Sequence, residues 1–169
     1  MPGNKYIANN VGTLTEVAAL QTSAGAGDAG KITALDASGK LDTSFMPTGI
    51  GADTAAIVSS ENLAAGDFVN IWNDAAAFKV RKADATVAGK EAHGFVLAAV
   101  TSPANATVYF EGSNTAVTGA TPGPQFLSTT AGGFVATAPS GSGNVVQRVG
   151  YATSATVINF QSLTPFVLA

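Results

Sequence analysis

The sequence predicts a mainly β protein, a small antiparallel β-barrel or sandwich preceded by an extended N-terminal arm with one short helix. Small residues dominate, since 82 of the 169 residues are Ala, Gly, Ser or Thr, and abundant Thr and Gly suit closely spaced strands and turns. Leu, Ile, Val and Phe still account for 40 residues, which is enough apolar material for a buried core. A chain of this length is expected to form one ordinary domain with an appendage.

Residues 1–53 have the features of an arm rather than a domain. Thr13 and Glu16 fit a capping box, a pattern that marks the start of a helix. We therefore expect a short helix over about 14–21, with an apolar stripe made by Leu14, Val17 and Leu20. Isolated helices of this length are marginal in water, so the arm must dock on another surface.

Two further segments complete the expected arm. The stretch 23–30 contains mainly Ala and Gly without periodicity, which predicts a flexible linker. A repeat then follows, because Gly-Lys-aliphatic occurs at 30–32 and 39–41 and Leu-Asp at 35–36 and 41–42. It predicts two short extended pieces joined by an Asp-x-Ser-Gly turn, and we expect Pro47 and Gly49–Gly51 to end the arm.

Residues 54–169 have the pattern of an antiparallel β domain. Apolar and β-branched runs alternate with turn signals such as Ala-Gly-Asp, Ser-Pro-Ala-Asn and Thr-Pro-Gly-Pro. Short strands at intervals of about 8–12 residues are typical of a barrel or sandwich. The expected strands are Ala56–Ser60, Phe68–Asn73, Ala77–Lys82, Gly94–Val100, Ala106–Glu111, Gln125–Ser128, Gly133–Thr137, Val145–Ala152 and Thr156–Gln161.

The composition argues against several classes of function. The chain has no Cys and a single His, His93, so thiolate chemistry and a multi-histidine metal site are not expected. Eight basic residues against eleven acidic ones argue against nucleic-acid binding. We also expect no membrane association, because no secretory signal is recognisable and no apolar run is long enough for a transmembrane helix.

No catalytic, cofactor-binding or metal-ligating residue is predicted. His93 precedes a predicted strand, where a side chain hydrogen-bonded to backbone is the ordinary role. Asp36 and Asp42 lack the dense acidic spacing of a calcium loop, so a solvated turn is the better interpretation. The basic cluster, made of Lys79, Arg81 and Lys82, is more typical of an exposed edge strand than of a phosphate site. We therefore expect a protein that is not an enzyme and needs no cofactor.

Charge is distributed unevenly along the chain. Glu111 and Arg148 are the only charged residues in 92–169. One interpretation is a surface of uncharged polar side chains. The other is a surface covered by further subunits, because the cores of protein interfaces are depleted in charge.

Two stretches resemble structural proteins of tailed-bacteriophage virions. The Gly-Lys-Ile and Leu-Asp-Ala-Ser-Gly-Lys-Leu-Asp runs within 30–42 are similar to segments of phage structural proteins that include tail fibres. The runs Leu63–Val69, Arg81–Thr86, Gly94–Leu97 and Ala106–Tyr109 resemble the small β domain of capsid decoration (cement) proteins.

The resemblance implies a protein on the outer surface of the capsid, made in the host cytoplasm. Such a protein is expected to be a homotrimer that ties neighbouring copies of the major capsid protein together. A tail-fibre or receptor-binding component is the alternative. The arm would contact its partner through nine apolar side chains: Ile7, Leu14, Val17, Leu20, Ile32, Leu35, Leu41, Phe45 and Met46.

Overall fold

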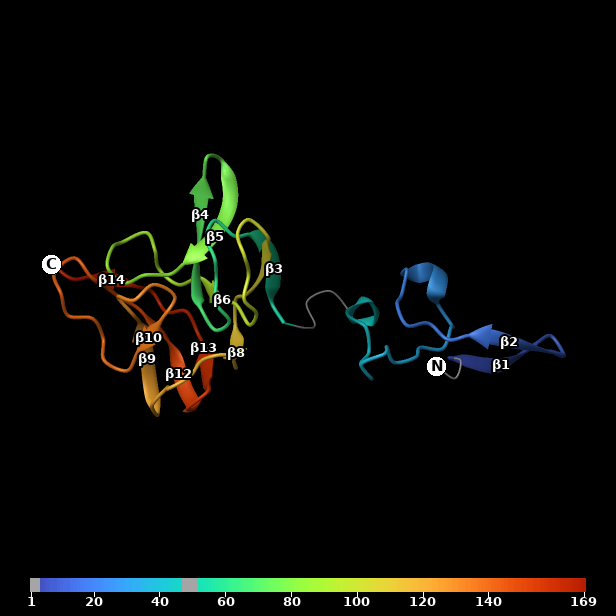
Figure 1. Ribbon diagram of the computed structural model, residues 1–169. Helices are drawn as coiled ribbons and strands as arrows, with labels where there is room; N and C mark the ends of the chain where they lie inside the picture. Colours follow the sequence, from blue (N-terminus) through green and yellow to red (C-terminus); the bar gives the residue numbers. More distant parts are fainter. Residues whose placement is uncertain (1–3, 47–51) are drawn as a thin grey trace. The chain divides into compact units, whose positions relative to one another are not determined.

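A computed structural model describes residues 4–46 and 52–169. The chain divides into two compact units, Met1–Gly51 and Ala52–Ala169 (Figure 1). The division falls two residues before the predicted boundary after residue 53. The predicted end of the arm at Pro47 and Gly49–Gly51 lies outside the described residues.

The N-terminal unit contains a β-hairpin, and the predicted helix over about 14–21 is wrong. Strand β1 (Lys5–Asn10) pairs antiparallel with β2 (Thr13–Ala18). Two short 3-10 turns follow, η1 (Ala26–Asp28) within the predicted linker and η2 (Thr43–Phe45). The described part of this unit is therefore built from a hairpin and turns.

The two-residue loop between β1 and β2 explains why the hairpin replaces the helix. Val11 and Gly12 both have positive φ angles, 51° and 88°, as in the type I′ turn that matches the twist of paired strands. Asn9 Oδ1 accepts a hydrogen bond from the Gly12 backbone N–H at 2.8 Å. Glu16, which a capping box would aim at the Thr13 backbone, instead forms an ion pair with Lys5 on the opposite strand.

The predicted Asp-x-Ser-Gly turn is present, but the two pieces that it joins do not form paired strands. The Gly39 N–H donates to the Asp36 carbonyl at 3.0 Å, and the Asp36 N–H donates to the Lys40 carbonyl at 2.8 Å. No strand flanks the turn within the described residues of this unit. The first extended piece pairs elsewhere, through a parallel bridge between Leu20 and Thr33.

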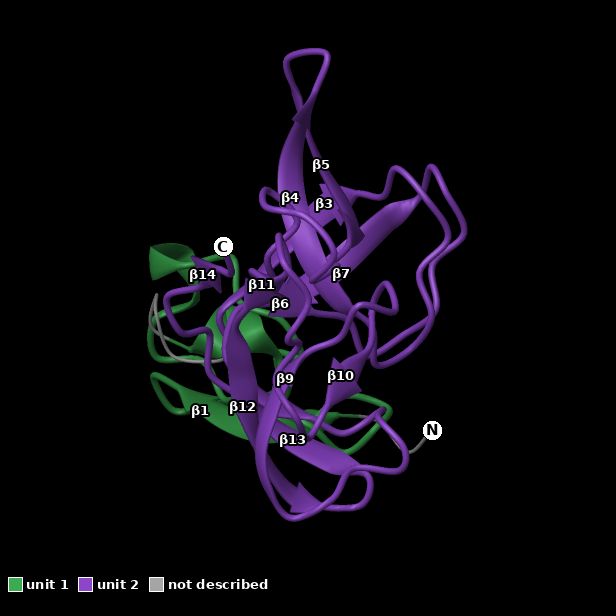
Figure 2. Cartoon of the chain, turned by 90° about the vertical axis from the view of Figure 1, so that its left-hand side faces the viewer, with its two compact units in different colours: residues 1–51 green, residues 52–169 purple. Residues whose placement is uncertain are grey.

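The second unit is a pair of five-stranded antiparallel sheets, which confirms the prediction of a mainly β protein (Figures 1 and 2). One sheet has the order β3-β7-β6-β4-β5 and the other β10-β9-β12-β13-β8. A small two-stranded sheet adds β11 and β14. The strands are β3 (Thr54–Val58), β4 (Phe68–Asp74), β5 (Ala77–Lys82), β6 (Gly94–Phe95), β7 (Asn105–Tyr109), β8 (Gly112–Asn114), β9 (Gly123–Leu127), β10 (Phe134–Val135), β11 (Val145–Val146), β12 (Arg148–Ser154), β13 (Val157–Phe160) and β14 (Phe166–Val167).

The observed strands match the expected ones except at five places. Strand β8 and strand β14 were not predicted. The predicted strand Gly94–Val100 is reduced to the two residues of β6, and the predicted strand Gly133–Thr137 is reduced to the two residues of β10. The predicted strand Val145–Ala152 is divided at Gln147 into β11 and β12, which belong to different sheets.

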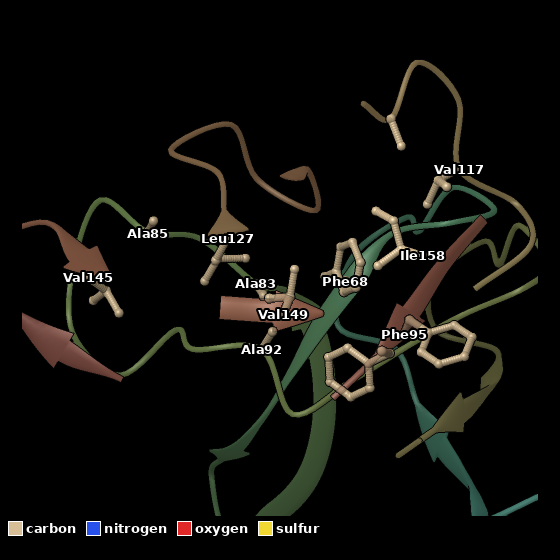
Figure 3. Packing of buried hydrophobic residues seen from close by; sticks show 12 residues of the cluster. Phe68, Ala83, Ala85, Ala92, Phe95, Val117, Leu127, Val145, Val149 and Ile158 are labelled. Atoms are coloured by element: carbon tan, nitrogen blue, oxygen red, sulfur yellow. The ribbon is translucent and has the colours of Figure 1, made fainter. Parts of the chain in front are cut away.

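The main core lies between the two five-stranded sheets. Phe68 and Phe95 come from one sheet and Phe160 from the other, and all three are buried. The ring centroids of Phe68 and Phe160 are 5.7 Å apart, and those of Phe95 and Phe160 are 5.6 Å apart. Figure 3 shows Phe68 between the aliphatic side chains of Val149 and Ile158. This packing of two facing sheets is consistent with a β-sandwich.

A second core cluster lies on the other face of the β3-β7-β6-β4-β5 sheet. It contains Leu63, Val69, Val80, Val96, Ala106 and Val108, all buried. The sheet curls far enough that Ser59 forms a bridge with Val80, and the Ser60 N–H donates to the Val80 carbonyl at 2.9 Å. Strands β3 and β5 do not form a ladder over residues 52–169. The barrel alternative is therefore not confirmed.

The buried amide of Gln147 connects the two parts of the predicted strand to a distant loop. Its Oε1 accepts from the Ala92 N–H at 2.7 Å, and its Nε2 donates to the Ala92 carbonyl at 2.9 Å. The side chain thus supplies the pair of hydrogen bonds that a neighbouring strand would supply. Because an unpaired polar group is costly in a core, this amide fixes the loop against the sandwich.

The loop of the β4–β5 hairpin predicts a stabilising substitution. Ala75 and Ala76 have φ angles of 51° and 69°, a region that costs a residue with a Cβ about 1 kcal/mol relative to glycine. Ala76→Gly is expected to stabilise the β unit by about 0.5–1 kcal/mol. Urea unfolding followed by the fluorescence of Trp72, the single tryptophan, measures the effect.

Ala77→Gly is the matched control for this prediction. Ala77 lies in β5 outside the positive-φ loop, so its replacement by glycine is expected to destabilise the unit by about 0.5–1 kcal/mol. Equal destabilisation by Ala76→Gly and Ala77→Gly would show that the loop conformation stores no strain.

Candidate functional site

The described residues hold no group of three His, Cys, Asp or Glu side chains that could bind a metal ion. His93 is exposed, and its Nδ1 accepts a hydrogen bond from the Ile71 N–H at 3.1 Å, which confirms the predicted contact with backbone. Over the same described ranges, no helix is long and apolar enough to cross a membrane.

The acidic residues considered for calcium act as turn acceptors. The Asp36 carboxylate accepts from the N–H groups of Ser38 and Lys40, at 2.8 and 2.9 Å. The Asp42 carboxylate accepts from the Ser44 N–H at 2.9 Å. Both carboxylates thus stabilise local loop structure, as expected for turns.

The basic cluster lies on β5, which is an edge strand of its sheet as predicted, but its three residues are half-buried rather than exposed. Each of its three side chains has a partner. Lys79 pairs with Asp74 at 2.6 Å, and the Lys82 ammonium lies 3.6 Å from the Asp67 carboxylate. The Arg81 guanidinium lies 4.6 Å from the centre of the Trp72 ring. These contacts account for the cluster without an anionic ligand.

The N-terminal unit is the strongest candidate for a binding surface, because none of its described residues 4–46 is buried. A unit of this size would ordinarily cover some apolar side chains in a core. Six of the nine predicted contact residues are instead exposed: Ile7 (64%), Leu14 (72%), Ile32 (52%), Leu35 (55%), Leu41 (40%) and Met46 (43%). The other three, Val17, Leu20 and Phe45, are half-buried.

The hairpin gathers two of these residues on one face. Ile7 pairs with Glu16 and Asn9 pairs with Leu14, so Ile7 and Leu14 lie diagonally across the same face of the β1–β2 hairpin. Val17 lies on the opposite face, where it pairs with Tyr6. The hairpin separates the three residues assigned to one helical stripe, because Leu14 and Val17 point to opposite faces and Leu20 follows β2.

The other predicted contact residues are held by backbone and polar contacts. The Leu20 N–H donates to the Ile32 carbonyl at 2.9 Å, and Gln21 Nε2 donates to the Leu35 carbonyl at 2.9 Å. The Ser23 N–H donates to the Ser44 hydroxyl at 2.8 Å, next to Phe45 in the chain. Such contacts order the backbone and leave the side chains of Ile32 and Leu35 exposed.

Exposed apolar residues that the sequence analysis did not predict lie elsewhere in the chain. Phe78 and Val80 alternate with Lys79 and Arg81 along β5, a pattern that puts both apolar side chains on one inward face. Val80 is buried as this pattern indicates, but Phe78 is 81% exposed. Val11 is 99% exposed because it forms the loop of the first hairpin. Further exposed residues are Val58, Val87, Tyr151, Phe166 and Val167.

Two carboxylates predict how the N-terminal unit responds to acid. The hydroxyl and backbone N–H of Ser44 lower the pKa of Asp42 below its usual value of 3.8, and the Lys31 ammonium and the Ala24 N–H lower the pKa of Asp28. A carboxylate whose pKa is lowered by folding stabilises the folded state at pH values above its unfolded-state pKa. This stabilisation is lost as the pH falls through the folded-state pKa. We expect the loop contacts to persist at neutral pH and to be lost below pH 3.8.

The Ser44 backbone amide is the reporter for this prediction. Its NMR chemical shift should titrate with a midpoint below 3.8. Asp42→Asn should abolish that titration, because an amide oxygen still accepts the hydrogen bond without ionising. A midpoint at or above the usual value would contradict the stabilising role of the carboxylate.

The fold and these surfaces define a mainly β protein whose N-terminal unit exposes six of its nine predicted contact residues. Comparison of the chain with protein-family models, with curated proteins and with solved structures finds no match in any of the three.

Proposed function

We propose that this chain is a non-enzymatic structural protein of a tailed-bacteriophage virion, a capsid decoration protein. It binds the outer head surface as an oligomer and stabilises contacts between major capsid proteins. The observation that carries the proposal is the contrast between the two units. Residues 52–169 contain two buried clusters, whereas no described residue of 4–46 is buried.

This contrast supports a role for the N-terminal unit as the arm that lies on a neighbouring protein. A two-stranded hairpin without a core is marginally stable by itself. Contact with a partner would cover Ile7 and Leu14 and would stabilise the hairpin at the same time. The partner is proposed to be the major capsid protein, because the resemblance in both parts of the chain is to virion proteins.

Self-association as a homotrimer is part of the proposal. It is supported by the two charges in residues 92–169, since interface cores are poor in charge. A trimer matches a three-fold position on an icosahedral shell, where each copy meets an equivalent neighbour.

A tail-fibre or receptor-binding component is the second candidate. The repeated Gly-Lys-aliphatic run at 30–32 and 39–41 favours it, because this run resembles fibre segments. The described N-terminal unit has one such turn, around Asp36–Gly39, which is short for a fibre shaft.

Electron microscopy of particles distinguishes these candidates. Purified chain is added to particles that lack it, and the added density is located. Density over the outer head surface is the expected result. Density confined to the tail would reject the decoration protein and support the tail-fibre component. Absence of binding to either part of the particle would reject both candidate functions.

A further inference from the structure

The tip of the β4–β5 hairpin presents an aromatic side chain that its own unit leaves uncovered. Phe78 is 81% exposed. It lies on the same hairpin face as Val80 and Val69, which are buried in the second core cluster. The apolar face of the hairpin therefore continues beyond the part that the unit covers. Figure 2 shows this hairpin projecting from the rest of residues 52–169.

The tip is also narrow and without unpaired charge. Its loop and the residue after it are Ala75, Ala76 and Ala77, whose side chains add only methyl groups beside the ring. The nearest charges, Lys79 and Asp74, pair with each other at 2.6 Å. Such a tip can enter a recess with little desolvation of charged groups.

The same unit carries a recess of suitable size and chemistry. A pocket of about 290 Å³ is lined by Leu97, Ala98, Ala99, Val100, Asn105, Thr107 and Tyr109. None of these lining residues is charged. A cavity of about 150 Å³ holds a benzene ring, so a phenyl group fits into this pocket with room for part of the loop.

The floor of the pocket connects to the main core. Leu97 and Tyr109 pack against the inter-sheet cluster, and the Tyr109 ring stacks on Phe95 with centroids 5.3 Å apart. An aromatic ring that entered the pocket would extend this row of rings. Aromatic side chains seated in such desolvated recesses commonly dominate interface energetics.

We propose that Phe78 of one copy inserts into the pocket formed by Leu97–Val100, Asn105, Thr107 and Tyr109 of a second copy. The two surfaces differ, so the contact is heterologous, and each copy offers one ring and one pocket. Where a three-fold rotation relates the copies, such a contact closes three of them into a ring. The inference specifies the contact behind the proposed homotrimer and rests on the self-association in that proposal.

Two variants test the two sides of this contact. Phe78→Ala removes the ring, and Thr107→Arg fills the pocket at an exposed position of β7. Sedimentation of the full chain is expected to show self-association weakened at least ~10-fold by either change. Phe166→Ala is the matched control, because Phe166 is also exposed, at 58%, and lies outside the contact.

A mixture of the two variants gives the sharpest result. The Phe78→Ala chain keeps an intact pocket, and the Thr107→Arg chain keeps an intact Phe78. An equimolar mixture is expected to form heterodimers through one intact contact, at concentrations where each variant alone associates at least ~10-fold more weakly than the wild type. If Thr107→Arg fails to fold by circular dichroism, Ala98→Arg replaces it, since Ala98 is exposed at the same pocket.

Several outcomes would overturn the contact. These are a wild-type chain that stays monomeric in solution, a Phe78→Ala chain that associates like the wild type, and a mixture without heterodimers. Attachment to particles is measured separately by electron microscopy. A trimer that persists in Phe78→Ala rejects this contact alone, whereas normal ring formation without attachment to particles rejects the proposed function alone.

Discussion

Phe68→Ala is expected to destabilise the β unit by about 3–5 kcal/mol, a range typical of buried Phe→Ala changes. Phe68 is fully buried between the sheets. Its ring centroid lies 6.3 Å from that of Phe134 and 5.7 Å from that of Phe160, so truncation leaves a cavity that two rigid rings cannot fill. Because whole domains are stable by only about 5–15 kcal/mol, the loss brings the unit close to unfolding.

Urea unfolding followed by Trp72 fluorescence measures this effect. Phe166→Ala is the matched control, since the same substitution is made at a side chain that is 58% exposed and lies outside the proposed contact. It is expected to change stability by less than about 0.5 kcal/mol. Similar losses for both variants would contradict the assignment of Phe68 to the core.

Deletion of residues 1–51 is expected to leave the β unit folded and to weaken attachment to particles by about 100-fold or more, because a tethered second contact acts at high effective concentration. The two main sheets and both buried clusters lie within residues 52–169. Thermal unfolding should therefore remain cooperative in the truncated chain. A binding titration on particles that lack the protein measures the loss.

A double variant separates the apolar contacts from the presence of the hairpin. Ile7→Ser with Leu14→Ser removes the two side chains of one exposed face, while Thr13→Ser is a control on the other face. The double variant is expected to lose most of the attachment that deletion loses. Truncated chain that binds particles with undiminished affinity would assign attachment to the β unit alone.

The strands of the β unit were predictable where alternation and turn signals agree. Strand β5 matches its predicted bounds, and β4 differs by one residue. The division of the predicted strand at Gln147 was not predictable. Strands β11 and β12 join different sheets, and the hydrogen bonds of the Gln147 side-chain amide reach a loop 55 residues away. Tertiary contacts of this kind leave no local pattern.

The error over residues 14–21 has a specific physical cause. Leu14, Val17 and Leu20 are spaced three apart, which fits a helical face, and Thr13 with Glu16 fits a helix start. The deciding feature is the Val11–Gly12 loop, whose positive φ angles direct the following residues back along β1. Because the chain has so many small residues, the few larger apolar side chains of this segment fit the spacing of a short helix and that of a short strand about equally well.

The candidate contact residues of the N-terminal unit were predictable only as a set. The sequence indicates that this segment has too few apolar side chains for a core, and six of the nine predicted residues are exposed. Their grouping follows from strand register, which the helical interpretation could not supply. Phe78 was missed because alternation identifies a strand's apolar face without indicating where the covering layer ends.

The order of strands in the second sheet determines when this protein can fold during synthesis. Strand β9 lies between β10 and β12, and within residues 52–169 β8 pairs only with β13, so β8 and β9 cannot complete their pairing before β12 and β13 have been synthesised. Val149, Ile158 and Phe160 also complete the inter-sheet cluster. We therefore expect the second sheet to be completed only after residue 160 has left the ribosome. Exposed strand edges favour aggregation during that interval. The scarcity of large apolar side chains limits the apolar surface that the incompletely folded chain exposes.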